Sequence, residues 1–184
     1  MGDPSDAELV QRVVRHDDRR AFAHLVARHQ SELRRSLRRF VRDDAAWADD
    51  LAQETFLIAY RRLVTFRGDS SLRTWIYRIG YRLFLSQLRA RPPPADAIDA
   101  VSEIATNGDD PGSMAHGFIL DYARALTTLT PEQARAVHLS MERGFTHAEI
   151  ALIMDVPLGT AKSHVLRGRA QLQTLLGDWA SRLG

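Results

Sequence analysis

Residues 145–176 read FTHAEIALIMDVPLGTAKSHVLRGRAQLQTLL, a stretch that holds two helix starts on either side of a tight turn. Thr146 is followed three residues later by Glu149, which is the spacing of a capping box. In a capping box each of the two side chains satisfies a free backbone N–H in the first turn of a helix. The pattern therefore predicts a short helix, whose apolar face is expected to hold Ala148, Ala151 and Leu152.

Asp155 and Pro157 are expected to end this first helix, because a residue that precedes proline is pushed out of the α region. A second helix is then expected from about Leu158 to about Leu176. At 100° per residue, one side of this helix carries small and apolar residues, namely Leu158, Ala161, Val165, Gly168 and Leu172. The other side carries polar residues, namely Thr160, Ser163, His164, Arg167 and Gln171.

A short helix, a tight turn and a longer helix with a polar outer face are typical of a helix-turn-helix that reads DNA. The same pattern also fits an αα-hairpin whose polar face is only solvated. Charge favours DNA binding, because no acidic residue lies between Asp155 and Asp178, whereas Lys162, Arg167 and Arg169 do.

Charge is distributed in blocks along the 184 residues, although the formal net charge is only +2. Lys162 is the only lysine among 25 basic residues, and an arginine bias of this kind can also reflect a GC-rich genome. Arginines dominate residues 28–42 and 61–91, whereas residues 43–54 and 92–123 hold acids and no Lys or Arg. Alternating blocks suit a protein that meets both a polyanion and a basic protein surface.

The composition excludes several classes of protein. A hydrophobic content of 45% is enough for packed cores, and the absence of cysteine excludes disulfides and thiolate metal sites. The first ten residues do not resemble a secretion signal, and no stretch approaches 18 apolar residues, so we expect a cytoplasmic protein without membrane insertion. The seven histidines show no metal-ligand spacing and no nucleophile–base pair is recognisable, so we expect no metal, no cofactor and no catalytic residue.

Helical periodicity predicts an all-α chain made of two small domains. Besides Thr146, the expected caps at helix starts are Ser5, Asp17 or Asp18, Asp43 or Asp44, Ser70 or Ser71, and Thr130, and Gly144 is expected to end a helix. The periodicity stops in an acidic stretch that is rich in Pro and Gly. We therefore expect one domain over residues 1–91, a flexible linker over 92–117 and a second domain over 118–184.

The helix expected after Ser71 has two apolar faces, which suggests that it lies against two neighbours. We assign the face with Leu72, Trp75, Ile76, Ile79 and Leu83 to the core; the second face holds Tyr77, Tyr81, Phe84 and Leu88. Arginines alternate with aromatic residues along this helix, and such a surface can hold phosphates while it stacks on unpaired bases. Arg78, Tyr81 and Arg82 are interpreted in this way, although arginines here can also serve only solubility.

An acidic helix precedes that segment. Asp50, Gln53 and Glu54 share one helical surface by their three- and four-residue spacing. Such a face is often only solvated. It could also belong to a Mg²⁺-dependent all-α enzyme that uses Asp49, Asp50 and Glu54, but a hard cation needs oxygens from facing helices, and this domain offers no second acidic cluster on a helix.

Together these segments resemble a bacterial extracytoplasmic-function sigma factor, the two-domain type of the primary sigma superfamily. The resemblance rests on DDLAQETF (49–56), WIYRIGYRLFLSQLR (75–89), LTPEQARAV (129–137) and GFTHAEIALIMDVPLGTAKSHVLRGRAQL (144–172), and it covers about residues 21–176 apart from the linker. It implies an alternative sigma factor that binds core RNA polymerase and directs promoter recognition, DNA melting and transcription initiation. It also implies a stress or envelope response and restraint by an anti-sigma factor, and we expect a monomer when the chain is free.

The resemblance also implies roles for individual residues. Asp50, Gln53 and Glu54 match the surface that docks on the clamp helices of the largest polymerase subunit, and the second domain meets the flap of the second-largest subunit. The residues matched to the minus-ten promoter element are Phe66, Arg67, Asp69, Ser70, Arg73, Arg78, Tyr81, Arg82 and Arg89. Those matched to the minus-thirty-five element are Thr146, Thr160, Lys162, Ser163, His164 and Arg167. The acidic linker matches the segment that threads toward the polymerase active centre.

Four positions depart from the family pattern. Arg82 and Ser86 stand where Asn and Asp are common, and His164 stands where Arg is common. Asp155 replaces a turn glycine, and Asp tolerates the left-handed conformation that such a turn needs. A rival interpretation is a plain helix-turn-helix regulator with a helical regulatory domain, which would bind duplex DNA without polymerase.

Overall fold

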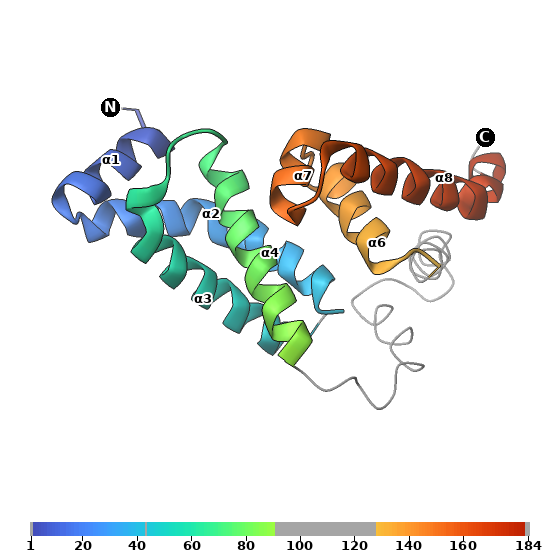
Figure 1. Cartoon of the computed structure of the whole chain (residues 1–184), viewed down its shortest axis with the longest axis horizontal. Coiled ribbons are helices and arrows are strands. Elements are labelled where there is room, and N and C mark those ends of the chain that lie inside the picture. Colours follow the sequence, from blue (N-terminus) through green and yellow to red (C-terminus); the bar gives the residue numbers. More distant parts are fainter. Residues whose placement is uncertain (1, 43, 91–127, 183–184) are drawn as a thin grey trace. The chain divides into compact units, whose positions relative to one another are not determined.

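The computed structural model describes residues 2–42, 44–90 and 128–182, with side chains described as far as residue 174 (Figure 1). Every regular element in these ranges is a helix, which confirms the all-α prediction. The helices form two compact units, one built from α1 to α4 and one from α6 to α8. The expected linker and the expected helix start near Phe118 lie outside the described residues.

The first unit is a bundle in which α2 packs against three other helices. Its elements are α1 (Asp6–His16), α2 (Arg19–Phe40), α3 (Ala45–Arg62), the short 3₁₀ helix η1 (Leu63–Thr65) and α4 (Leu72–Ala90). Helix α2 contacts α1, α3 and α4, and α3 also packs against α4. In Figure 1, α3 and α4 are joined by the loop that arches from η1 to the start of α4.

The helix starts of this bundle agree with the expected caps. Ser5 forms a capping box with Glu8, and Asp18 and Asp44 accept hydrogen bonds from the backbone N–H groups of the third residue on. The Ser71 hydroxyl likewise accepts from the Thr74 N–H at 3.1 Å. At Asp18, the Ala21 backbone N–H and then the Arg12 guanidinium lower the pKa of the carboxyl, so both contacts stabilise the ionised form that caps the helix. Local chemistry thus determines where these helices begin.

The two apolar faces of α4 pack against two neighbours, α2 and α3, as expected, but two of the residues assigned to the core lie at its edge. The buried positions of α4 are Leu72, Thr74, Ile76, Tyr77, Gly80, Tyr81 and Phe84. Trp75 and Ile79, expected in the core, are only half-buried, whereas Tyr81 is 3% exposed. Tyr81 contacts Phe40 of α2 and Phe84, with ring centroids 5.7 and 6.2 Å away. The core of the bundle therefore takes Leu72 and Ile76 from one face of α4 and Tyr77, Tyr81 and Phe84 from the other.

The second unit is a compact group of helices whose longest member is α8. Its elements are α6 (Pro131–Val137), the π-helical turn η3 (His138–Glu142), α7 (His147–Met154) and α8 (Leu158–Arg182). Capping boxes at Thr130 and Thr146 open α6 and α7, and Gly144 ends the preceding helical segment with φ +69°. Asp155 has φ 58°, which is the left-handed turn conformation that was expected of it.

The buried faces of this unit agree with the sequence for α8 and not for α7. On α8, Ala161, Val165, Gly168 and Leu172 are buried as expected, but Leu158 is exposed. On α7 the expected apolar face was wrong, since Ala148 and Leu152 are exposed and Ala151 is only half-buried. The buried side chains of α7 are instead Ile150, Ile153 and Met154.

At Gly168, helix α8 lies so close to α6 that a side chain would not fit without a shift. A Cβ atom at Gly168 would lie 2.5 Å from Val137 Cγ2. Because Val137 is fully buried and β-branched, it cannot move aside easily. Glycine at this position therefore sets the distance between the two helices.

Replacing Gly168 with alanine is expected to destabilise the second unit by about 1–3 kcal/mol, because the added methyl overpacks a filled core. Native-state hydrogen exchange of the α6 and α8 amides measures this loss within that unit. Gly159→Ala is the matched control: it lies in the same helix, and its Cβ would meet nothing within 4 Å. Alanine should raise stability there by about 0.5–1 kcal/mol. Equal effects of the two changes would contradict the close approach at Gly168.

Candidate functional sites

An acidic row lies on the exposed side of α3. The side chains of Asp50, Gln53 and Glu54 are all exposed, as the spacing predicted. Leu57 continues the row by one further turn and is 58% exposed, a large apolar side chain left in solvent. Leu57 was not predicted to belong to this row, although the spacing of Leu57 from Asp50 and Gln53 places it on the same helical face. The row therefore combines negative charge with an apolar contact, as many protein-binding surfaces do.

Gln87 of α4 is hydrogen-bonded to two side chains of α3, one of which belongs to the acidic row. The Trp47 indole N–H donates to Gln87 Oε1 at 2.7 Å, and Gln87 Nε2 donates to Glu54 Oε2 at 2.9 Å. Nearby, Arg34 of α2 pairs with Asp49 at 2.9 Å. Asp49 is thus held by the bundle, whereas Asp50 points away from it as an exposed charge.

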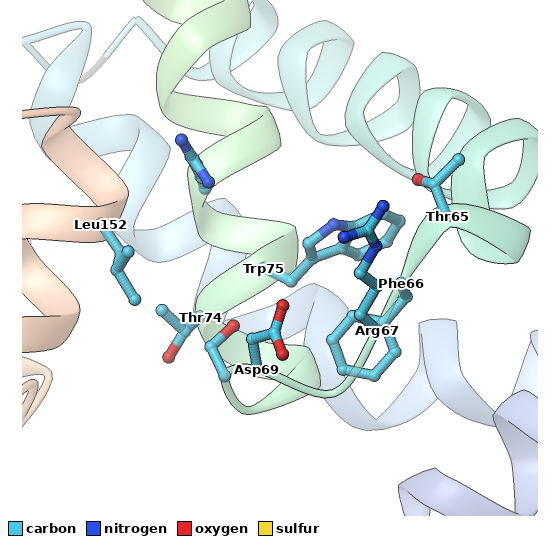
Figure 2. A pocket seen from close by; sticks show the side chains of 9 residues that line it. Thr65, Phe66, Arg67, Asp69, Thr74, Trp75 and Leu152 are labelled. Atoms are coloured by element: carbon cyan, nitrogen blue, oxygen red, sulfur yellow. The ribbon is translucent and has the colours of Figure 1, made fainter.

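A recess lies between the loop after η1 and the first turns of α4. Figure 2 shows side chains of the first unit around it, among them Thr65, Phe66, Arg67, Asp69, Thr74 and Trp75; Ser70 and Arg78 also line it. The rings of Phe66 and Trp75 lie 5.4 Å apart, centroid to centroid, and both are half-buried. We call this the Phe66–Trp75 recess. Its two rings offer stacking surface, and Arg67, Asp69 and Ser70 offer polar groups at the rim.

The arginines expected to contact DNA differ in their surroundings. Arg73 is part of the bundle, since its Nε atom donates to Glu32 of α2 at 3.0 Å and its guanidinium lies 5.6 Å from the Tyr77 ring centroid. Arg82 and Arg89 are exposed along α4, and Arg78 is half-exposed. The structure therefore groups the recess with Arg78 and places Arg82 and Arg89 farther along the same helix.

Tyr81 does not join this surface. Its ring is buried among Phe40 and Phe84, so it cannot stack on a base without leaving the core. The proposed stacking role for Tyr81 is therefore corrected to a core role. The half-buried rings available for stacking in this part of the bundle are Phe66 and Trp75.

Helix α8 presents the polar face that the sequence predicted. Thr160, Ser163 and His164 are half-buried, and Arg167 is exposed at its centre. Lys162 is also exposed, but it lies two residues from Thr160 and therefore about 200° around the helix, on a different side. Leu166 shares that side and is 60% exposed, a feature absent from the sequence analysis.

Thr146 lies at the start of α7, where its exposed side chain is already engaged. Its hydroxyl donates to Glu149 Oε2 at 2.9 Å and accepts from the Glu149 backbone N–H at 3.3 Å. A phosphate at this helix start would therefore meet a Thr146 hydroxyl that is already hydrogen-bonded to Glu149.

In the described parts of the chain, no helix has the length and apolarity needed to cross a bilayer. The same residues hold no group of three or more His, Cys, Asp or Glu side chains arranged around a possible metal position.

Comparisons with known proteins show the family of the chain. The family description "Sigma-70 region 2" matches residues 25–93, and "Sigma-70, region 4" matches residues 119–172. The chain is 37% identical over 182 residues to the RNA polymerase sigma-H factor of Pseudomonas aeruginosa, with 93% of each chain covered. It is 34% identical over 178 residues to the ECF RNA polymerase sigma-E factor of Salmonella typhimurium, covering 90% of this chain and 91% of the relative.

Two solved structures are similar in fold. One is CnrH in complex with the cytosolic domain of CnrY, with a TM-score of 0.67, 25% identity, and 94% of this chain and 97% of that chain covered. The other is the sigma factor RpoE in complex with the anti-sigma factor NepR from Bartonella quintana, with a TM-score of 0.62 and 24% identity over 85% of this chain and 96% of that chain. With two sigma regions in order and full-length relatives above 30% identity, this chain belongs to the ECF sigma factors of RNA polymerase.

Proposed function

We propose that this sigma factor divides its work among three surfaces: the acidic row of α3 for core RNA polymerase, the Phe66–Trp75 recess for the minus-ten element, and the polar face of α8 for the minus-thirty-five element. The observation that carries the proposal is the exposure of Asp50, Gln53 and Glu54 together on one face of α3. A plain DNA-binding regulator has no need for such a face beside its DNA contacts.

For polymerase, the acidic row is proposed to meet the clamp helices of the largest subunit. Negative side chains on this row complement a basic partner and steer the encounter, while Leu57 supplies apolar contact. The second unit is proposed to meet the flap of the second-largest subunit. Bond formation belongs to the polymerase; no catalytic, metal or cofactor role is assigned to this chain.

For the minus-ten element, the recess is proposed to hold one base flipped out of the duplex. Flipping costs a few kcal/mol of unstacking, and contact with Phe66 and Trp75 offsets part of that cost. Arg78, Arg82 and Arg89 are proposed to hold phosphates of the displaced strand and the adjacent duplex, where charge matters more than base identity. Arg73 contributes less to DNA in this proposal, because it is paired with Glu32.

For the minus-thirty-five element, α8 is proposed to enter the major groove with Thr160, Ser163, His164 and Arg167 facing the bases. Lys162, on another side of the helix, and Thr146, at the start of α7, are proposed to contact phosphates and position the helix. His164 reaches less far than the arginine common in the family and cannot form the bidentate contact to guanine.

Changing Arg167 to alanine is expected to weaken binding of the upstream element by about 1–3 kcal/mol, because Arg167 is exposed at the centre of the reading face. Holoenzyme binding to promoters with single base changes measures the loss and shows which base pair no longer matters. Arg169→Ala removes the same charge from α8, two residues away, off that face. If both variants weaken all promoters equally, Arg167 contacts phosphate and not a base.

The two DNA contacts are proposed to cooperate because one linker joins the two domains that make them. We propose that residues 1–91 and 118–184 act as separate DNA-binding domains joined by a linker over 92–117. Two weak contacts on one duplex then act at high effective concentration once polymerase holds both domains. In-vitro transcription with core enzyme tests the whole proposal: initiation requires this chain, and promoter binding by the chain alone stays weak. Tight binding of duplex DNA without polymerase would favour the plain regulator.

We also propose that an anti-sigma factor restrains this chain in a stress or envelope response. Support comes from the similar structures, in which CnrH is bound to the cytosolic domain of CnrY and RpoE to NepR. The free chain is proposed to be a monomer. Affinity capture of the chain from its own cells, followed by competition with core polymerase, tests whether the captured protein blocks polymerase binding.

A further inference from the structure

Gln87 occupies a position between two side chains of α3 that are far from it in sequence. Its Oε1 atom accepts from the Trp47 indole N–H at 2.7 Å, and its Nε2 atom donates to Glu54 Oε2 at 2.9 Å. Trp47 is buried and Gln87 is half-buried, whereas Glu54 is exposed. The chain of contacts therefore runs from the core of the bundle out to the acidic row.

The orientation of the Gln87 amide is determined by its inner partner. An indole nitrogen can only donate a hydrogen bond, so the amide oxygen of Gln87 must face Trp47. The NH₂ group then points the other way, and a carboxylate is an acceptor only. Trp47 thus fixes Gln87, and Gln87 fixes one oxygen of Glu54.

We propose that Gln87 is a positioning residue for polymerase docking: it holds the Glu54 carboxylate in the conformation that meets the polymerase. A free glutamate side chain samples many rotamers, and ordering it upon binding costs free energy. Gln87 removes part of this cost before the encounter. One carboxylate oxygen engages Gln87, which leaves the second oxygen and further lone pairs for a cation of the partner. The inference rests on the proposed docking role of Glu54.

A purely structural role for Gln87 makes a different prediction. If Gln87 served only to satisfy the buried indole N–H, its loss would affect folding and would weaken polymerase binding whether or not Glu54 were present. If it acts through Glu54, its effect on affinity disappears when Glu54 is absent. A double-mutant cycle separates the two roles.

The cycle compares the unaltered chain, Gln87→Met, Glu54→Ala and the double variant in their affinity for core polymerase. Gln87→Met should weaken binding about threefold to tenfold, as expected for one hydrogen bond to a charged group near the surface. Glu54→Ala should weaken it at least as much. The double variant should bind like Glu54→Ala alone.

The variant Gln87→Glu separates an effect on folding stability from an effect on polymerase affinity. Its carboxylate still accepts from Trp47, but it replaces the N–H donor with a second negative charge beside Glu54. Loss of the Nε2 donor should lower polymerase affinity here too, while the thermal unfolding midpoint stays closer to that of the unaltered chain than in Gln87→Met. Gln30→Met, at an exposed position of α2, is the matched control and should leave affinity unchanged.

The outcomes are distinguishable. If Glu54→Ala weakens binding but neither Gln87 variant does, the positioning role is overturned while docking by the acidic row stands. If Gln87→Met still weakens binding in the Glu54→Ala background, Gln87 acts through the fold or through direct contact, and the positioning role is again overturned. If Glu54→Ala has no effect, the docking proposal itself fails, and the positioning role fails with it.

Discussion

The variant Asp50→Arg with Glu54→Arg is expected to lose all co-purification with core RNA polymerase. Both side chains are exposed on α3, so the change leaves the bundle core intact. Each reversal removes one favourable contact and adds a repulsive one, and breaking a charge pair within an interface costs about 2–5 kcal/mol. Two such losses together reduce affinity at least about a thousandfold. Pull-down of core enzyme by the tagged chain measures the effect.

The control for this prediction is another exposed acid. Asp3 precedes α1 in the first unit, and Asp3→Arg introduces a charge reversal outside the acidic row. It should leave the complex largely intact, because an exposed ion pair such as that of Asp3 with Arg28 contributes little. Circular dichroism of each variant checks that helix content is unchanged. If polymerase still co-purifies with the double α3 variant, the acidic row is only a solvated face.

Phe66→Ala is expected to reduce open-complex formation about tenfold to a hundredfold, because stacking of one base on an aromatic ring contributes about 1–3 kcal/mol. Phe66 is half-buried and its ring lies beside that of Trp75, so its removal takes away one wall of the recess. Permanganate reactivity of unpaired thymines near the start site measures melting directly, and the upstream contact should be unaffected.

Templates with single abasic sites in the displaced strand give the matched comparison. With the unaltered chain, one abasic position should reduce melting far more than its neighbours, because the captured base is missing. With Phe66→Ala, that position should lose most of its extra effect, since the ring that stacked on the base is gone. If the same position stays equally important in both proteins, Phe66 does not contact the captured base.

Most helix starts could be predicted from the sequence because they depend on neighbours three residues away. Ser5 with Glu8, Asp18, Asp44 and Thr130 all cap the helices expected of them. The buried faces were harder, since packing against distant elements decides between them. In α4 both faces are apolar and both contribute buried residues, and only contacts such as that of Tyr81 with Phe40 show which members of each face lie inside.

Helix α7 shows a second limit of periodicity. Its sequence from Ile150 to Met154 is almost wholly apolar, so a helix of only eight residues gives no contrast between an inner and an outer side. Longer α8 has polar residues between its apolar ones, and there the inner face was predicted correctly at four of five positions, with Leu158 as the exception.

Among the candidate site residues, those on one helix could likewise be predicted from the sequence, whereas contacts between helices could not. Spacing alone placed Asp50, Gln53 and Glu54 together, because all three lie on one helix. The recess partner Trp75 was assigned to the core, and Gln87 was not recognised at all. Its two partners lie 40 and 33 residues away in sequence, so only the packing of α4 against α3 reveals the contact.

The absence of a side chain at Gly168 has a consequence for how the promoter choice proposed for this protein can change. A Cβ at this position would lie 2.5 Å from Val137 Cγ2, so any side chain there would displace Val137 or push α8 away from α6. In the proposed reading helix, a change of promoter preference is therefore expected from substitutions of the outward side chains, while the seat of α8 on α6 stays the same.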